Sequence, residues 1–275
     1  MPILTDTELL KVNYLKGKDA FEGSFVIEPL MPGYGLTIGH ALRRVLLSSL
    51  SGAAIHSVRI DGVTHEFSTL PGVKEDVIEI IMNLKNIDFK LDGDEPVTLK
   101  LEKKGAGVVR AKDFQKNSSI VVINTEAEIA TLDSKGKISM EVVIKKGQGY
   151  EPVERRKEEK MPLGTIAVDS VFTPIKKIHY NVENTRVGGM TNYDRVTLNI
   201  TTDGSITPED AFNTANQILI EHFNLISERM NNSVKKEKSV KAAEAVVEEK
   251  PKKAKAAKIE KLVKKDSKIT KKAKK

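Results

Sequence analysis

A glycine-rich loop that runs into an apolar helix is the first feature of this sequence that could bind a ligand. Residues 32–50 are PGYGLTIGHALRRVLLSSL, and Gly33, Gly35 and Gly39 give the spacing G-x-G-x-x-x-G. The dinucleotide fingerprint is G-x-G-x-x-G within a parallel strand–helix–strand unit, so this spacing is one residue too long. The phosphate-binding pattern G-x-x-x-x-G-K-[ST] does not occur. We therefore interpret the glycines as a tight turn and a close backbone approach at the helix start.

The other residues that could do chemistry are scattered. Histidines stand at positions 40, 56, 65, 179 and 222, and His65-Glu66 lacks the second histidine of an H-E-x-x-H zinc motif. The acids Glu75 and Asp76 stand where a helix is expected to begin, and the helix dipole favours negative charge there. The sequence has no cysteine and no G-x-S-x-G elbow. These patterns predict no catalytic site, no metal site and no cofactor.

The helix that follows the glycine loop has two different sides. On a helical wheel, Ile38, Ala41, Leu42, Val45, Leu46 and Ser49 share one side, which should pack on its own domain. The opposite side carries His40, Arg43, Arg44 and Leu47. A leucine among cations on an outer face favours an interaction patch.

A second amphipathic helix is expected over 207–232. Thr207 is a good N-cap, Pro208 fits the first helical position, and Asp210 can complete a capping-box-like pair. The apolar stripe is wider than one packing face requires and leaves out Ile220. Its members are Ala211, Phe212, Ala215, Ile218, Leu219, Phe223, Leu225, Ile226 and Met230. Two such helices near opposite ends of the chain suggest a shared core and a subunit interface.

Most of the chain between these helices has strand character. Turn signals at Lys16-Gly17, Asp61-Gly62 and Asp203-Gly204 separate several of the runs, and residues 72–87 have helical spacing instead. The segment 153–160, VERRKEEK, is a charged linker by composition. The pattern predicts an α+β fold with antiparallel sheets. The expected strands are 9–17, 20–29, 54–60, 96–101, 107–111, 119–123, 126–132, 138–145, 163–172, 176–183 and 193–202.

The charge is unevenly distributed. Residues 233–275 contain 17 Lys against six Asp or Glu, a net charge of +11, whereas the other 232 residues carry 28 basic and 32 acidic side chains. The low-complexity tail is too polar to bury a core, so we expect it to be disordered and to attract nucleic acid without sequence preference. The absence of cysteine, of a signal peptide and of any long apolar run suits a cytoplasmic protein with no membrane partner.

Four blocks of sequence together resemble the α subunit of bacterial DNA-directed RNA polymerase. With the G-x-G-Y run at 147–150 they span nearly all of residues 1–232 in order. The blocks are FVIEPLMPGYGLTIGHALRRVLLSSLSG (25–52), VRIDGVTHEFSTLPGVKEDVIEIIMNLK (58–85), VDSVFTPIKKIHYNVENTRV (168–187) and LNITTDGSITPEDAFNTANQILIEHF (198–223).

The resemblance implies a non-catalytic scaffold within a nucleotidyltransferase complex. It implies a homodimer formed through the helices 36–50 and 208–230, on which the β and β′ subunits assemble for transcription, with omega and sigma subunits in the complex. The family's ALRR motif matches Ala41–Arg44, so Arg44 is expected to contact β, together with His40, Arg43 and Leu47. Weaker β or β′ contacts are expected at Lys85, Asp169, Tyr180 and Arg186. The expected dimer interface consists of Leu42, Leu46, Leu50, Phe212, Leu219, Phe223 and Ile226.

The resemblance also implies a domain organisation. A discontinuous dimerisation domain would comprise 1–52 and 176–232, an inserted β-rich domain 53–175, and the disordered basic tail 233–275. Family members usually carry a helical C-terminal domain that binds promoter DNA, and the 43 low-complexity residues of the tail are too few and too polar for it. We therefore expect non-specific DNA attraction, nucleoid association in a bacterial cytoplasm, and no promoter recognition by the usual module.

Two alternatives remain open from the sequence. One is a nucleotide-binding transferase that uses the 33–39 loop, and saturable binding of ATP or NAD would support it. The other is a basic chromatin-like or ribosome-associated protein whose function resides in the tail. The net charge of −4 on the rest of the chain does not favour the second alternative.

Overall fold

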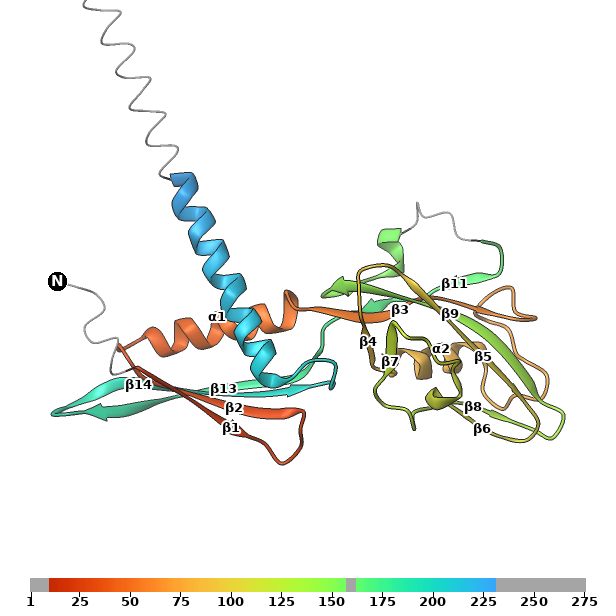
Figure 1. Ribbon diagram of the computed structural model, residues 1–275, viewed down its shortest axis with the longest axis horizontal. Coiled ribbons are helices and arrows are strands. Elements are labelled where there is room, and N and C mark those ends of the chain that lie inside the picture. The colour runs from red at the N-terminus through yellow and green to blue at the C-terminus, as the bar shows by residue number, and fades with distance from the viewer. Residues whose placement is uncertain (1–9, 157–161, 231–275) are drawn as a thin grey trace, which may run out of the picture. The chain divides into compact units, whose positions relative to one another are not determined.

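Segments from opposite ends of the sequence form one antiparallel sheet. The structure is a computed structural model that describes residues 10–156 and 162–230. The sheet has the strand order β1 (Lys11–Lys16), β2 (Glu22–Leu30), β14 (Met190–Thr202) and β13 (Ile175–Val187). Figure 1 shows these four strands side by side, and β2 pairs directly with β14. The strands near residues 20–29 and 193–202 were expected, but their pairing was not.

Two helices supply the apolar layer of this sheet. Helix α1 (Tyr34–Ser48) lies along β13 and β14, as Figure 1 shows. A second helix is described over 208–230, and Phe212 near its start stacks on Phe25 of β2 with 4.3 Å between ring centroids. The buried residues of this core are Phe25, Ile27, Leu30, Leu42, Leu46, Leu50, Ile175, Val196, Leu198, Ile200, Ala211, Phe212 and Ala215.

A second core lies in the segment from Ile55 to Val168. Its main sheet has the order β5 (Val97–Lys104), β9 (Lys137–Gln148), β3 (Ser51–Ile60), β4 (Phe89–Leu91) and β7 (Ile120–Val122), with β11 (Thr165–Ala167) also paired to β3. Two short pairs accompany it: β6 (Gly107–Arg110) with β8 (Glu128–Leu132), and β10 (Tyr150–Glu151) with β12 (Ser170–Val171). Helix α2 (Val77–Lys85) packs against β8 and β3. The α+β prediction is confirmed.

Helix α2 is shorter than the helix predicted over 72–87. Val73 forms a β-bridge with Leu132, and the Glu75 carboxylate accepts hydrogen bonds from the Thr131 N–H at 2.6 Å and its hydroxyl at 2.9 Å. The helix begins only after Asp76, whose Oδ1 accepts the Glu79 N–H at 2.7 Å. The prediction that Glu75 serves the helix dipole was therefore wrong, because its carboxylate anchors strand β8 instead.

The segment predicted as a charged linker over 153–160 has a structural role in its described part. Residues Val153–Arg156 form a short 3-10 helix, and Arg156 is only 6% exposed. Its Nη1 lies 2.6 Å from Nδ1 of His56, and its Nη2 donates to the Val168 carbonyl. The linker prediction was wrong for Arg156, since composition does not reveal which arginine in a charged run finds buried acceptors.

Strand boundaries differ at several other points. The structure adds β4 and β10, which the sequence pattern did not predict, and it divides the expected strand 163–172 into β11 and β12. The chain divides into two units, 1–219 and 220–275, and the boundary falls within the helix over 208–230. The predicted tail over 233–275 lies outside the described residues.

Candidate functional site

The glycine loop holds a carboxylate of the chain itself. Gly33 adopts φ 85°, and the N–H groups of Gly33 and Gly35 both donate to Oδ2 of Asp194 at 2.9 Å. A Cβ on Gly35 would lie 2.7 Å from Val182 and 2.9 Å from Asp194, so only glycine fits. The loop is therefore a small anion-binding turn at a helix start, already filled by Asp194 of β14. This occupancy argues against the nucleotide-binding alternative.

Helix α1 is held close to the sheet by its second internal glycine. A Cβ added to Gly39 would come 2.7 Å from the ring of Tyr180 on β13. Leu42 and Leu46 are buried beside it, and the apolar side predicted from the wheel faces the core. Tyr180 is half-buried in this contact, so part of its surface serves the fold.

The opposite side of α1 faces solvent. His40, Arg43 and Arg44 are exposed, and Leu47 is 38% exposed. All four residues come from one helix within eight positions, so the structure brings them together on one surface. The helix itself runs from Tyr34 to Ser48, two residues earlier at each end than the range 36–50. The arginine pair and the leucine form a cationic patch with an apolar centre, which we call the α1 patch.

The seven residues expected at a dimer interface divide into two groups. Leu42, Leu46, Leu50 and Phe212 are at most 6% exposed and belong to the core of the chain itself. Because the chain's own core already covers these four side chains, they offer almost no surface to another subunit. Leu219 is half-buried, whereas Phe223 and Ile226 are 67% and 61% exposed. The exposed residues are therefore the ones that could meet a partner.

The helix over 208–230 begins as its sequence predicts. The Thr207 hydroxyl accepts the Asp210 N–H at 3.1 Å and donates to the Asp210 carboxylate at 2.7 Å. This capping arrangement fixes where the helix starts and so which residues face the sheet. Beyond residue 219 the helix carries large exposed apolar side chains, namely Ile220, Phe223, Leu225, Ile226 and Met230.

Two of the four residues expected to make weaker β or β′ contacts pair with each other. Lys85, at the end of α2, donates to Asp169 with Nζ and Oδ2 3.1 Å apart, and both side chains are about one-third exposed. The hydrogen bond from the Val153 N–H, with that from Lys85, lowers the pKa of Asp169 below its ordinary value. Arg186 lies elsewhere, at the β13–β14 end, where its Nε donates to the Gly188 carbonyl at 2.8 Å.

The described residues contain no group of three or more His, Asp or Glu side chains that could hold a metal ion. None of the described helices combines the length and the apolar character that crossing a bilayer requires. Sequence reasoning missed Asp194 entirely. An aspartate inside the alternating pattern of a predicted strand, NYDRVTLNI, was the available signal, because a buried carboxylate needs hydrogen-bond donors.

Comparison with known proteins places this fold in a family. The RNA polymerase Rpb3/RpoA insert domain family matches residues 58–173. A protein of Alkaliphilus oremlandii (strain OhILAs) named DNA-directed RNA polymerase subunit alpha is 48% identical over 235 residues, which cover 82% of this chain and 74% of the relative. The chain belongs to the bacterial DNA-directed RNA polymerase α subunit family.

Further relatives of the same name have similar coverage. The α subunit of Oceanobacillus iheyensis is 46% identical over 235 residues, 84% of this chain and 75% of the relative. That of Clostridium kluyveri (strain NBRC 12016) is 48% identical over 240 residues, 84% of this chain and 76% of the relative. The resemblance expected from the four sequence blocks is thereby confirmed, and this family member spans about three quarters of these relatives' length.

Proposed function

We propose that this protein is a scaffold subunit of a DNA-directed RNA polymerase that homodimerises and then binds the β and β′ subunits. Its relatives are named as α subunits of that enzyme. In this proposal the chain contributes to nucleotidyl transfer by assembling the complex, and the partner subunits carry the reaction. The proposed domains are the dimerisation domain over 1–52 and 176–232, the inserted domain over 53–175, and the basic tail.

The observation that carries the dimer proposal is the exposed apolar stripe on the helix over 208–230. Phe223, Ile226 and Met230 are each more than 60% exposed and follow Leu219 at helical spacings of four, seven and eleven residues. These spacings place them on one face of the helix. Burying a large apolar side chain stabilises by about 1.5–3 kcal/mol. A two-fold dimer would bury the same stripe on both subunits.

The α1 patch is the surface proposed for the β subunit. Arg44 offers planar guanidinium donors that suit a carboxylate or a carbonyl pair, and Leu47 offers an apolar anchor beside it. The patch faces away from the side of α1 that the core uses, so partner binding would not disturb the fold. Lys85 and Asp169, with the exposed Arg186 and the open part of Tyr180, are proposed as secondary contacts with β or β′.

The Lys-rich tail is proposed to attract DNA without sequence preference, because its net charge is +11. The omega and sigma subunits are proposed as further partners in the assembled enzyme. Formation of the dimer is the first step of this proposal and can be tested directly.

The test replaces one residue of the exposed stripe with a charge. Phe223→Glu in the full chain should give a folded monomer, because two symmetric copies would bury two unpaired carboxylates. Light scattering on a sizing column, over a range of protein concentrations, measures the mass. The matched control is Asn213→Glu, which places the same charge at an exposed polar position of the same helix and should leave the dimer intact.

A wild-type chain that stays monomeric at every concentration would contradict the dimer proposal. So would a Phe223→Glu chain that keeps the full dimer mass. Circular dichroism of each variant checks that the fold is retained, so that loss of mass cannot be mistaken for unfolding.

A further inference from the structure

One half of the outer face of the four-stranded sheet carries polar side chains that have no side-chain partner among the described residues. The inner face of this sheet packs on α1 and on residues 211–219 of the second helix, and the outer face points away from that core. Strand register arranges six outer residues in two rows across β2, β14 and β13. One row is Ser24, Asn199 and His179, and the next is Glu22, Thr201 and Lys177.

Several polar side chains on the other half of the same face pair with one another. Arg195 donates from Nε to Glu28 at 2.5 Å, and Thr185 lies within hydrogen-bond distance of the same carboxylate oxygen. Asn181 donates to Glu183 at 2.9 Å. The Arg195–Glu28 pair crosses strands, as polar pairs on an exposed sheet commonly do, and the Asn181–Glu183 pair runs along β13. The two rows without side-chain partners therefore differ from the paired side chains of the same face.

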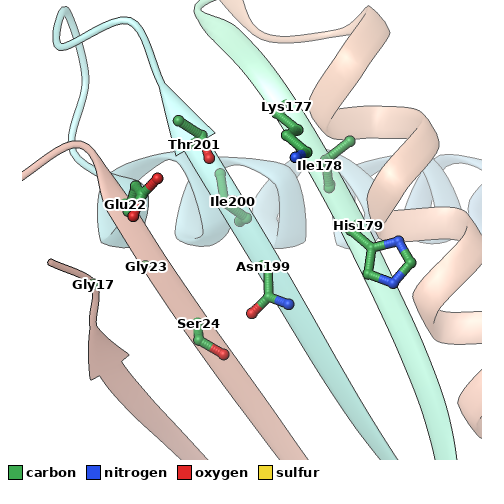
Figure 2. A pocket seen from close by; sticks show the side chains of 10 residues that line it. All are labelled: Gly17, Glu22, Gly23, Ser24, Lys177, Ile178, His179, Asn199, Ile200 and Thr201. Atoms are coloured by element: carbon green, nitrogen blue, oxygen red, sulfur yellow. The ribbon is translucent and has the colours of Figure 1, made fainter. Parts of the chain in front are cut away.

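The unpaired rows line a groove. Its volume is about 600 Å³, and it is bounded by Gly17 of the β1–β2 connection at one end. Figure 2 shows the three strands side by side, with Ser24 on β2, Asn199 and Thr201 on β14, and Lys177 and His179 on β13. His179, on the edge strand, forms the outer margin of the groove. The hollow and the unpaired side chains thus coincide.

The chemistry of the groove favours a negatively charged ligand. Five of the six side chains can donate hydrogen bonds, namely the Ser24 and Thr201 hydroxyls, the Asn199 amide, the His179 imidazole and the Lys177 ammonium. The one carboxylate, Glu22, lies on β2, two strands away from Lys177 in the same row. Adjacent strands are about 4.8 Å apart, so Glu22 stands roughly 10 Å from the cationic margin.

We propose that this groove binds a small multivalent oxyanion, held between Lys177, His179 and Asn199. Residues two apart on β13 are about 6.6 Å apart, and Asn199 lies one strand spacing from His179, directly opposite it. Asn199 is diagonal to Lys177, at roughly 7–8 Å between backbones. Such a triangle can surround one phosphate or carboxylate group while Ser24 and Thr201 donate to further oxygens. Because the groove is open to water, the affinity should be modest, with a Kd of about 1 mM.

The test follows the histidine imidazole protons of the full chain by NMR at neutral pH and physiological ionic strength. Sodium pyrophosphate is titrated in one series and sodium citrate in another. The chain has five histidines, and the resonance that disappears in His179→Gln identifies His179. Its Hε1 resonance should move saturably, with the other four nearly still. A response to both anions assigns a general oxyanion site, and a response to pyrophosphate alone assigns a phosphate site.

Two lysine variants separate a built site from diffuse attraction. Lys177→Met should weaken the His179 response about fivefold, the loss expected for one exposed charge-assisted contact. The matched control is Lys90→Met, an exposed lysine on β4 of the other sheet, which should leave the response unchanged.

Two results would overturn the proposal. One is a His179 resonance that stays still through the millimolar range of both anions. The other is an equal loss of response in Lys177→Met and Lys90→Met, since that would show general electrostatic attraction. The readout does not depend on dimerisation or on β binding, so its failure leaves the proposed scaffold function standing.

Discussion

The carboxylate of Asp194 accounts for the conformation of the glycine loop, because it accepts both of the loop's N–H groups. Its Oδ2 accepts two backbone N–H groups at the start of α1, where four N–H groups of any helix lack an intrahelical partner. The residue is 8% exposed, and its position on β14 ties the helix to the sheet. The loop therefore uses both of these N–H donors to hold the fold together, and neither is available to a phosphate.

Asp194→Ala should destabilise the protein by about 1–3 kcal/mol, because at least the buried Gly35 N–H would lose its acceptor. Urea unfolding at a fixed protein concentration measures the difference. Asp92→Ala, at an exposed aspartate of the β4–β5 connection, is the control and should change the free energy of unfolding little. Equal stability of the Asp194→Ala and wild-type chains would show that water replaces the carboxylate fully.

Asp203 is the opposite case, a carboxylate whose charge opposes folding. Burial raises the pKa of Asp203, and the nearby Asp88 acts in the same direction. The Ser205 N–H and hydroxyl both donate to its Oδ1, at 2.8 and 2.6 Å. A carboxyl whose pKa is higher in the folded state weakens stability as pH rises from the ordinary aspartate range through the folded pKa.

Asp203→Asn should therefore leave the free energy of unfolding at neutral pH unchanged or higher. Its amide oxygen can still accept both bonds from Ser205, and the buried charge is gone. Urea unfolding between acidic and neutral pH should show a smaller decline with rising pH than in the wild type. Asp92→Asn serves as the control. A clear loss of stability at neutral pH in Asp203→Asn would contradict this account.

Among the elements, strand β8 is anchored by Glu75, an acidic residue two positions before α2. Burial opposes ionisation of Glu75, but the hydrogen bonds from the Thr131 N–H and hydroxyl outweigh it, and the net effect lowers the pKa of Glu75. A lowered folded pKa stabilises above the ordinary glutamate pKa, and this contribution is lost as pH falls through the folded value. The start of α2 should therefore loosen in acid.

Glu75→Gln should lower stability at neutral pH, and its difference from the wild type should shrink as pH falls below the ordinary glutamate range. The glutamine keeps the shape but loses the charge that strengthens both hydrogen bonds. Chemical unfolding at neutral pH and at about pH 3 compares the two chains. Glu79→Gln, an exposed acid in the first turn of α2, is the control. A difference that stays constant with pH would mean that the Glu75 charge does not contribute.

At the level of the whole molecule, the surfaces proposed for different partners lie on different elements. The dimer proposal uses the helix over 220–230, and the β proposal uses the exposed side of α1. The core of the four-stranded sheet depends on neither exposed surface, since its buried residues come from other positions. Loss of β binding should therefore leave the dimer, the first step of the proposed assembly, intact.

Arg44→Ala tests this separation. The variant should keep the dimer mass by light scattering, and it should capture the β subunit at least about tenfold more weakly in a pull-down. The reason is that Arg44 is exposed on the side of α1 that faces away from the core. Arg59→Ala, an exposed arginine on β3, controls for the loss of one positive charge. A monomeric Arg44→Ala chain would place this arginine in the dimer interface instead.

Much of the fold followed from short-range patterns in the sequence. The Thr207 cap, the two sides of α1 and the turns at Asp61-Gly62 and Asp203-Gly204 all depend on residues within a few positions of one another. Sterics and hydrogen bonding within one turn of chain decide such features, so the residues alone predict them. The family also followed from the residues, because four ordered blocks of sequence carry far more information than one motif.

The partners of distant residues required the folded chain. Asp194 lies 159 positions from Gly35, and Arg156 lies 100 positions from His56. The wheel of α1 could not show that Leu42 and Leu46 are fully covered by the chain's own sheet. The wheel of the helix over 208–230 likewise could not show that Phe223 and Ile226 stay exposed. Strand register alone aligned Lys177 and His179 beside Asn199. Contacts between remote segments arise from the packing of whole elements, and no local rule specifies which side chains that packing will bring together.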